Sequence, residues 1–150
     1  MSYSKIRPYF KQAIESVNSS FTEWKDALVF DDVQNVPSSI LDRSYHIEIG
    51  TIGSTLDAGG FTIKGTTVIV TIFKKGFNSP QDALDELLDI ADCIDAEVTR
   101  ATNVETYKAD NNISFEKIDL LTITPSEIDT TNDNVVQCKI EFNVTILLCA

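Results

Sequence analysis

The most constraining feature of this chain is a strict alternation near its end, where residues 136–148 place apolar and polar side chains on opposite faces. The apolar positions are Val136, Cys138, Ile140, Phe142, Val144, Ile146 and Leu148. A period of two over this length predicts one long β-strand with a buried face and a solvent face. Since this is about twice the usual strand length, we expect it to form the spine of a sheet and to run past the core at one end.

Length and charge fit a single soluble domain over residues 1–150. A chain of 150 residues with 43% hydrophobic residues buries roughly 70% of the surface of its unfolded chain, so a core can form without disulfides or metals. Its 23 acidic and 12 basic residues give a net charge of −11, which repels nucleic-acid phosphates and anionic lipid. No run approaches the roughly 20 apolar residues that span a bilayer. We therefore expect no sequence-specific DNA binding and no membrane association.

Two segments have helical periodicity. An aromatic and aliphatic stripe within residues 6–24 predicts an amphipathic helix of about 20 residues. Residues 83–98 carry a second apolar stripe, and the preceding Ser79 and Pro80 supply an N-cap and a proline at the first helical position. Residues 99–112 are polar and have neither period, so we expect a loop there.

Three further segments, residues 45–49, 67–73 and 115–124, have the composition of strands. Every glycine except Gly76 lies between residues 50 and 65, which predicts a long β-hairpin arm whose tip lies beyond the globular body. Residues 125–134 are expected to be a hairpin connection to the last strand. The order α-β-β-α-β-β predicts an α+β fold, in which a four-stranded antiparallel sheet packs two helices on one face.

Signals for catalysis or cofactor binding are weak. His46 is the only histidine, it lies on a predicted strand, and no nucleophile lies in a GxSxG turn. Lys64 precedes Gly65, whereas a phosphate-binding loop has its lysine after the glycine. The aspartates at 31 and 32 and at 129 and 133 lack the spacing of a calcium loop. We therefore expect no enzyme activity, no metal and no cofactor.

The three cysteines, Cys93, Cys138 and Cys149, are odd in number and have no CxxC spacing. Cys93 falls in the second predicted helix and Cys138 on the inward face of the last strand. We expect small buried apolar side chains in a reducing compartment.

The second predicted helix carries an acidic stripe. Four carboxylates share one side by the i, i+3, i+4 rule: Asp82, Asp85, Glu86 and Asp89. Such a stripe is explained by an exposed face that keeps the protein soluble. The competing interpretations are a face that meets a basic partner surface and the wall of a passage through which DNA slides without sticking.

Residues 36–50, VPSSILDRSYHIEIG, resemble the loop and first strand of the tail terminator (tail completion) proteins of long-tailed bacteriophages. The length, the element order and the glycine-rich segment also suit that family. The resemblance implies a structural virion protein, made in the host bacterial cytoplasm and located in the tail and neck. It implies a hexameric ring at the head-proximal end of the tail tube, which ends tail polymerisation and offers a joining surface to the head connector. The implied partners are other copies of the chain, the tail tube protein and the head-tail connector (stopper) protein, and DNA passes through without specific binding.

The resemblance and the predicted arm together suggest which residues contact a neighbouring subunit. The loop supplies Pro37, Asp42, Arg43 and Tyr45, and the arm supplies Leu56, Phe61, Ile63 and Lys64. A ring requires head-to-tail interfaces, and an extended arm suits strand addition to a neighbour. The Arg43 guanidinium suits a bidentate bond to a carboxylate across the interface; the alternative is a local salt bridge to Asp42 or Glu48.

Two other functions remain open. One is a different ring of the neck, such as a stopper or adaptor of the head-tail connector. The other is a non-viral α+β domain that binds a small ligand, which predicts a defined apolar pocket with a few convergent polar groups.

Overall fold

The longest strand is an interior strand of the sheet. A computed structural model of the protein describes residues 3–23, 41–58, 61–76, 79–111, 115–129 and 134–149. In it β6 (Asn134–Cys149) pairs antiparallel with β4 (Phe61–Lys75) on one side and with β5 (Phe115–Asp129) on the other. The six described inward side chains from Val136 to Ile146 are fully buried. The predicted spine and its buried face are confirmed.

The fold is mixed α+β, with three α-helices and an open six-stranded sheet within the described residues. The sheet order is β1-β2-β4-β6-β5, and β3 pairs with β4. The prediction of a four-stranded, wholly antiparallel sheet is wrong, because β1 (Thr22–Glu23) pairs parallel with β2 (Ser44–Ile49). A two-residue strand has no periodicity to read.

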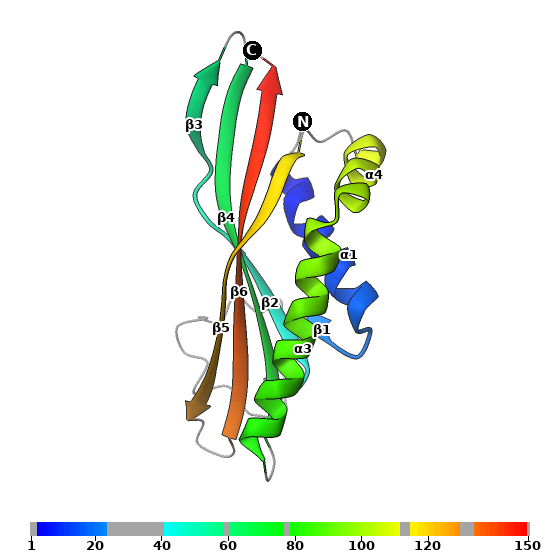
Figure 1. Ribbon diagram of the computed structural model, residues 1–150, viewed down its shortest axis with the longest axis vertical. Helices are drawn as coiled ribbons and strands as arrows, with labels where there is room; N and C mark the ends of the chain where they lie inside the picture. The colour runs from blue at the N-terminus through cyan, green and yellow to red at the C-terminus, as the bar shows by residue number, and fades with distance from the viewer. Residues whose placement is uncertain are drawn as a thin grey trace.

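The glycine-rich segment belongs to the same sheet. β3 (Gly53–Ala58) pairs antiparallel with the first part of β4, from Gly53↔Gly65 to Ala58↔Phe61. β4 also stays paired with β6 as far as Phe61↔Cys149, whereas the last β5–β6 pair is Phe115↔Ile146. These ends of β3, β4 and β6, which we call the distal end, run past the helices at the top of Figure 1. The distal end is thus built from three strands, not from a hairpin alone.

The three helices cover one face of the sheet (Figure 1). α1 (Ile6–Val17) follows a short 3₁₀ turn, η1 (Tyr3–Lys5), and is shorter than predicted. Asn18 is extended, and its side-chain oxygen accepts the Ser20 amide at 3.0 Å, which ends the helix. α3 (Pro80–Thr99) begins as predicted, with the Ser79 hydroxyl accepting the Asp82 amide.

Most of the predicted loop at residues 99–112 is instead a helix, α4 (Ala101–Asn111). Its sequence has no apolar stripe, and only Val104 and Tyr107 of this helix are buried. Tyr107 holds it in place, because its hydroxyl donates to the Lys5 carbonyl at 2.7 Å and its ring stacks on Phe115 at a centroid distance of 6.0 Å. Tertiary contacts decide this helix, so a reading of periodicity alone misses it.

β5 also extends into the predicted hairpin connection. Residues 125–129 are paired with β6, and Pro125 lies within the strand, opposite Cys138. Proline is tolerated there because β5 is an edge strand, where an amide on the outer side needs no partner. Bulges near Glu116 and Leu121 interrupt the pairing and increase the local twist.

The cysteines differ from one another. Cys138 is fully buried in the core, as predicted, and burial raises the pKa of its thiol to about 11. Cys93 is exposed on α3, so the prediction of a buried side chain is wrong at this position. The apolar face of α3 is turned to the sheet through Ala83, Leu87, Ala91 and Ile94, and Cys93 lies outside that face.

Candidate functional site

Asp42 and Arg43, predicted to contact a neighbour, form the turn that leads into β2. Pro37 lies outside the described residues. A carboxylate oxygen of Asp42 accepts the Lys75 amide at 2.9 Å, which ties the turn to the end of β4. Arg43 has a left-handed backbone with φ 57°, its amide donates to the Phe73 carbonyl at 3.0 Å and its carbonyl accepts the Thr22 amide at 3.0 Å. The turn therefore joins β4, β1 and β2 at one corner of the sheet.

The Arg43 guanidinium projects from this corner. The residue is exposed, and its side chain reaches the Ser20 hydroxyl at 3.4 Å. Within the part of the chain that the structure describes, no ion pair joins it to Asp42 or Glu48.

Tyr45 belongs to the core. Its side chain is fully buried, and its hydroxyl donates to a carboxylate oxygen of Glu15 at 3.0 Å. Burial, followed by the bond to Glu15, raises the pKa of Tyr45 far above its ordinary value. The ring cannot contact a neighbour without unpacking, so Tyr45 positions the turn from inside.

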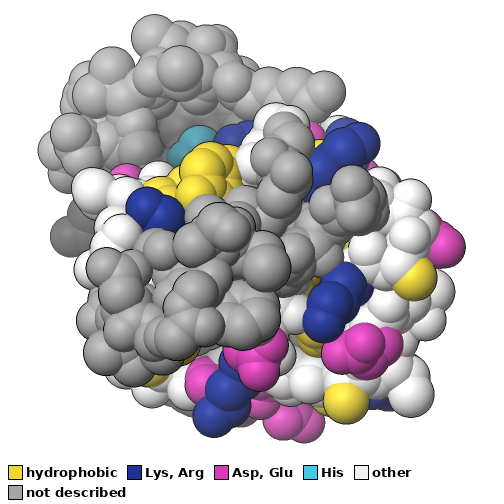
Figure 2. All heavy atoms as spheres, turned by 90° about the horizontal axis from the view of Figure 1, so that it is seen from above, with side chains coloured by type: hydrophobic (Ala, Val, Ile, Leu, Met, Phe, Trp, Pro, Cys, Tyr) yellow, Lys and Arg dark blue, Asp and Glu magenta, His cyan; other side chains and the backbone are white. Residues whose placement is uncertain are grey.

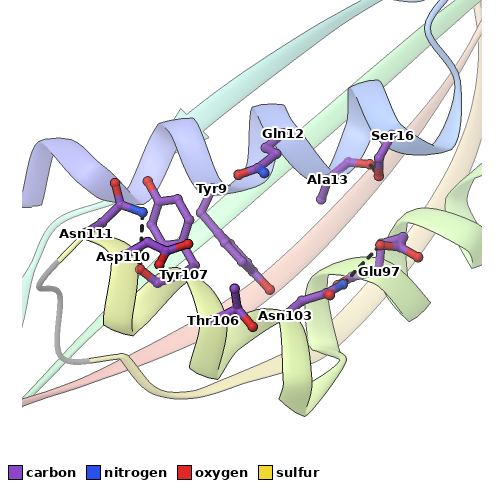
Figure 3. Close-up of a pocket in the computed structure, with 10 residues that line it drawn as sticks. All are labelled: Tyr9, Gln12, Ala13, Ser16, Glu97, Asn103, Thr106, Tyr107, Asp110 and Asn111. Atoms are coloured by element: carbon purple, nitrogen blue, oxygen red, sulfur yellow. Dashed lines mark hydrogen bonds between the residues drawn. The ribbon is translucent and has the colours of Figure 1, made fainter.

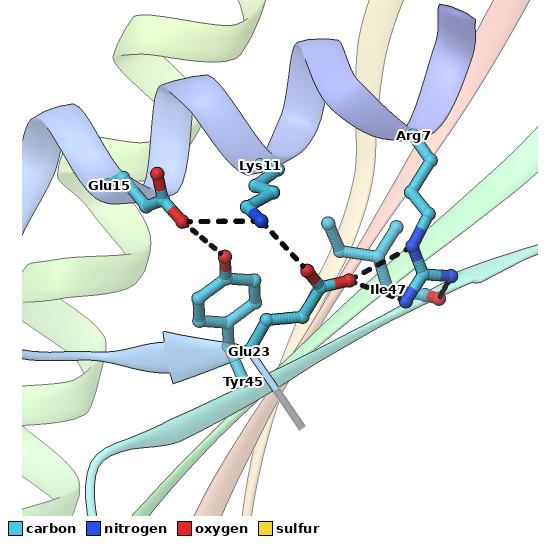
Figure 4. A network of polar contacts seen from close by, with 6 residues as sticks. All are labelled: Arg7, Lys11, Glu15, Glu23, Tyr45 and Ile47. Atoms are coloured by element: carbon cyan, nitrogen blue, oxygen red, sulfur yellow. Dashed lines mark hydrogen bonds and ion pairs between the residues drawn. The ribbon is translucent and has the colours of Figure 1, made fainter. Parts of the chain in front are cut away.

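A network of charges connects α1 to the sheet edge (Figure 4). The Glu23 side chain is only 5% exposed and its carboxylate binds Arg7 at 2.6 Å and Lys11 at 3.3 Å. A second nitrogen of the same guanidinium, Nη1, donates to the Ile47 carbonyl of β2 at 3.0 Å. Burial opposes the charged carboxylate, but the bonds and charges of Arg7 and Lys11 outweigh it, so the pKa of Glu23 lies below its ordinary value.

Sequence reasoning missed this network. Arg7, Lys11 and Glu15 recur every fourth residue, which marks one charged face of α1. Nothing in that spacing shows that Glu23, which lies beyond the helix end, closes the set. Only the fold brings residues 7, 23 and 47 together.

The predicted arm residues lie at the distal end. Leu56 pairs with Ile63, and Phe61 pairs with both Ala58 and Cys149; the side chains of Leu56 and Phe61 are outside the described part of the structure. Ile63 is half-buried. The Lys64 ammonium donates to the Ser54 hydroxyl across the β3–β4 pair at 3.0 Å. These residues are brought together by strand pairing, at a place separate from the Arg43 corner.

The predicted acidic stripe is exposed along α3. Asp82, Asp85, Glu86 and Asp89 all face solvent. Glu86 forms an ion pair with Lys74 of β4, and Asp85 accepts a hydrogen bond from Gln81 at 3.1 Å. In Figure 2, acidic and basic side chains are interspersed over the described surface that is seen from the distal end. α3 begins at the end of the molecule opposite the distal end in Figure 1, so the acidic stripe, which lies in the first half of this helix, is remote from the distal end.

A cavity of about 330 Å³ lies between α1 and α4 (Figure 3). Its walls include Tyr9, Ala13 and Tyr107, but most of the lining is polar: Gln12, Ser16, Glu97, Asn103, Thr106, Asp110 and Asn111. The Asn103 amide donates to the Glu97 carboxylate at 3.0 Å. The Tyr9 hydroxyl donates to the Val98 carbonyl at 2.5 Å, and burial together with the charge of Glu97 raises its pKa to about 12. Several of the polar groups bind one another, and the cavity lacks the apolar lining typical of a small-ligand site.

The described residues offer neither a metal centre nor a membrane-spanning helix. No group of three or more His, Cys, Asp or Glu side chains among them is placed to hold a metal ion. None of the helices described is long and apolar enough to cross a membrane. His46 lies on β2, opposite Thr71 of β4.

No protein-family model and no curated protein matches this chain. The surfaces that remain to be explained are the Arg43 corner, the distal end, the two edges of the sheet and the acidic side of α3.

Proposed function

We propose that this protein is a tail terminator of a long-tailed bacteriophage: a structural virion protein that forms a hexameric ring on the last ring of the tail tube, ends its polymerisation and joins it to the head connector. The observation that best supports this proposal is the open sheet, whose central strands continue past the helical layer. A closed ring needs two different complementary surfaces on each subunit. An open sheet has two different edges, here β5 on one side and β1, β2 and β3 on the other.

The distal end is the part of the subunit that we propose acts as the arm. Beyond Ile146, β6 has no β5 partner within the described residues. Backbone amides and carbonyls at such an edge are a template for a strand of another chain. Leu56, Phe61 and Ile63 are apolar residues of the same strand ends, and we propose that a tube or a neighbouring subunit packs against this end.

The charge of the protein fits passage of DNA through the ring without specific binding. Six subunits of net charge −11 produce a strongly negative potential, which limits adhesion of DNA phosphates. Asp82, Asp85 and Asp89 are exposed on one side of α3 and are the carboxylates that we place on the bore or on the face of a basic partner.

Two alternatives are weaker. A stopper or adaptor ring of the neck shares the need for head-to-tail interfaces, and it is distinguished by binding the connector without capping tubes. A small-ligand-binding domain predicts an apolar pocket, and the polar cavity between α1 and α4 gives this alternative little support.

Tube polymerisation tests the proposal directly. The tail tube protein from the same genome is polymerised with and without this protein, and tube lengths are measured by electron microscopy. We expect shorter tubes that carry a cap at one end and no longer add subunits there. Tubes of unchanged length, with no protein bound at either end, would contradict the proposal.

Replacing Arg43 should weaken self-association more than stability. Arg43→Ala and Arg43→Gly both remove the exposed guanidinium, but only glycine adopts φ 57° without steric cost. We expect both variants to associate less in sedimentation velocity, and we expect the glycine variant to be the more stable by up to about 1 kcal/mol. An unchanged sedimentation profile in both would remove Arg43 from the interface.

A further inference from the structure

Among the residues that the structure describes, the outer edge of β2 is only partly covered. β1 pairs with Ser44 and Tyr45 alone, and past Tyr45 no described strand lies on that side of β2. A strand edge left in this state presents backbone groups that can pair with another chain. The carbonyl of Ile47, two residues past the end of the β1–β2 pairing, is the next acceptor to which a longer partner strand would bond.

The guanidinium of Arg7 donates a hydrogen bond to that carbonyl. Nη1 donates to Ile47 at 3.0 Å, while Nε and Nη2 donate to one carboxylate oxygen of Glu23 at 3.0 Å and 2.6 Å. Glu23 is itself the second residue of β1. One side chain from α1 therefore holds the short strand on the edge and covers the next acceptor of the same edge.

The ion pair between Arg7 and Glu23 is strong because the Glu23 carboxylate is largely buried. Its side chain is 5% exposed, and Lys11 binds its other oxygen at 3.3 Å. Charge-assisted bonds at such distances are about twice as strong as neutral ones. Among the described residues, the other charged and titratable neighbours are Glu15, which lies 3.9 Å from Lys11, and Tyr45, which is bonded to Glu15.

We propose that Arg7 and Glu23 form a latch that closes the β2 edge to strand addition in the free subunit, and that an extended strand of a second copy of this chain displaces it during assembly. This inference rests on the proposed ring. It explains why a subunit with an open sheet need not polymerise through its edges before it meets a tube.

The occupant that fits this edge is the β5 edge of the second copy. β5 is the other end of the same sheet order, so β5-to-β2 contacts are head-to-tail, as a ring requires. At the bulge near its middle, Leu121 is 51% exposed, although most large apolar side chains of the described core are buried. Pairing along β5 would remove this side chain from water.

Self-association without any tube tests the latch. The variants Glu23→Gln and Arg7→Ala are compared with wild type by light scattering over a concentration series. Glu23→Gln keeps the size and one acceptor of the side chain but removes its charge, and Arg7→Ala frees the Ile47 carbonyl. We expect the concentration of half-association to fall by about tenfold or more, the equivalent of one charge-assisted hydrogen bond.

Lys11→Ala is the matched control, because it removes a cation from Glu23 but leaves Arg7 on the Ile47 carbonyl. We expect a clearly smaller change from this variant. Leu121→Ser, combined with Glu23→Gln, should reverse the gain if β5 is the partner edge. Thermal unfolding of each variant confirms that the compared proteins are folded, and Glu23→Gln serves alone if Arg7→Ala is unfolded.

Folded Glu23→Gln that associates at the same concentration as wild type, or less readily, would overturn the latch. So would a Lys11→Ala change as large as that of Glu23→Gln, since the Ile47 carbonyl would then be irrelevant. The latch and the proposed function fail separately. Normal tube capping with unchanged self-association rejects only the latch, whereas the expected gain in a protein that never caps tubes rejects only the terminator assignment.

Discussion

Deletion of residues 56–63 should abolish the capping of tail tubes and leave a folded subunit. The deletion removes the outer ends of β3 and β4, including the pairs Leu56↔Ile63 and Ala58↔Phe61. It keeps β4 from Lys64 onward, where Val68, Val70 and Ile72 are buried in the core. Because the core is untouched, we expect thermal unfolding to remain cooperative, while the surface that we propose for the tube is lost.

A matched control for this deletion is Ser54→Ala, since Ser54 is not among the predicted interface residues. It removes the bond from Lys64 to Ser54 but retains every strand of the distal end, so we expect it to cap tubes. Both proteins are added to polymerising tube protein and the tube lengths are compared with those produced by wild type. If the deletion variant still yields tubes of wild-type length, the distal end is not the assembly element.

Truncation of Phe142 should destabilise the protein far more than any of the surface substitutions above. Phe142 is fully buried, lies in the middle of β6 opposite both Val68 of β4 and Leu120 of β5, and its ring centroid is 5.4 Å from that of Phe10 on α1. Phe142→Ala therefore leaves a cavity where the sheet meets the helices. We expect a loss of about 3–5 kcal/mol in the free energy of unfolding.

Urea unfolding of Phe142→Ala and of Thr145→Ala measures this effect. Thr145 lies on the opposite face of the same strand and is half-buried, so we expect it to lose less than about 1 kcal/mol. Similar losses of unfolding free energy from the two variants would contradict the assignment of one buried face and one solvent face to β6.

Several elements could be predicted from the sequence because local pattern and tertiary packing agree in them. In β6 the alternation from Val136 to Ile146 coincides with burial, so periodicity alone finds both the strand and its core face. In α3 the cap at Ser79, the proline at position 80 and the apolar stripe mark the same start.

Other elements could not be predicted because distant contacts decide them. α4 is fixed by Tyr107, which bonds to Lys5 and stacks on Phe115, and these contacts are invisible in its own polar sequence. β1 is two residues long and depends on the Arg43 carbonyl and on Arg7 for its place. The charge network of Arg7, Lys11 and Glu23 could not be predicted for the same reason, because only the fold brings Glu23 to α1.

The candidate interface was predicted in part. The motif at residues 36–50 predicted that Asp42 and Arg43 are interface residues. In the structure Asp42 is half-buried and Arg43 is exposed, at one corner of the sheet. The motif did not separate them from Tyr45, because alternation along a strand does not say which face is buried until the sheet is complete. Tyr45 is fully buried in the core. The charged residues that lie at the nearby sheet edge are instead Arg7 and Glu23.

The mass of the protein in solution tests the proposed ring most directly. Light scattering is recorded over a range of protein and salt concentrations, first alone and then after addition of tail tubes, with the bound protein counted per tube end. A hexameric ring predicts a species of six times the 16.6 kDa chain mass, either free at high concentration or as six copies per tube end. A monomer at every concentration, with no copies bound to tubes, would contradict it.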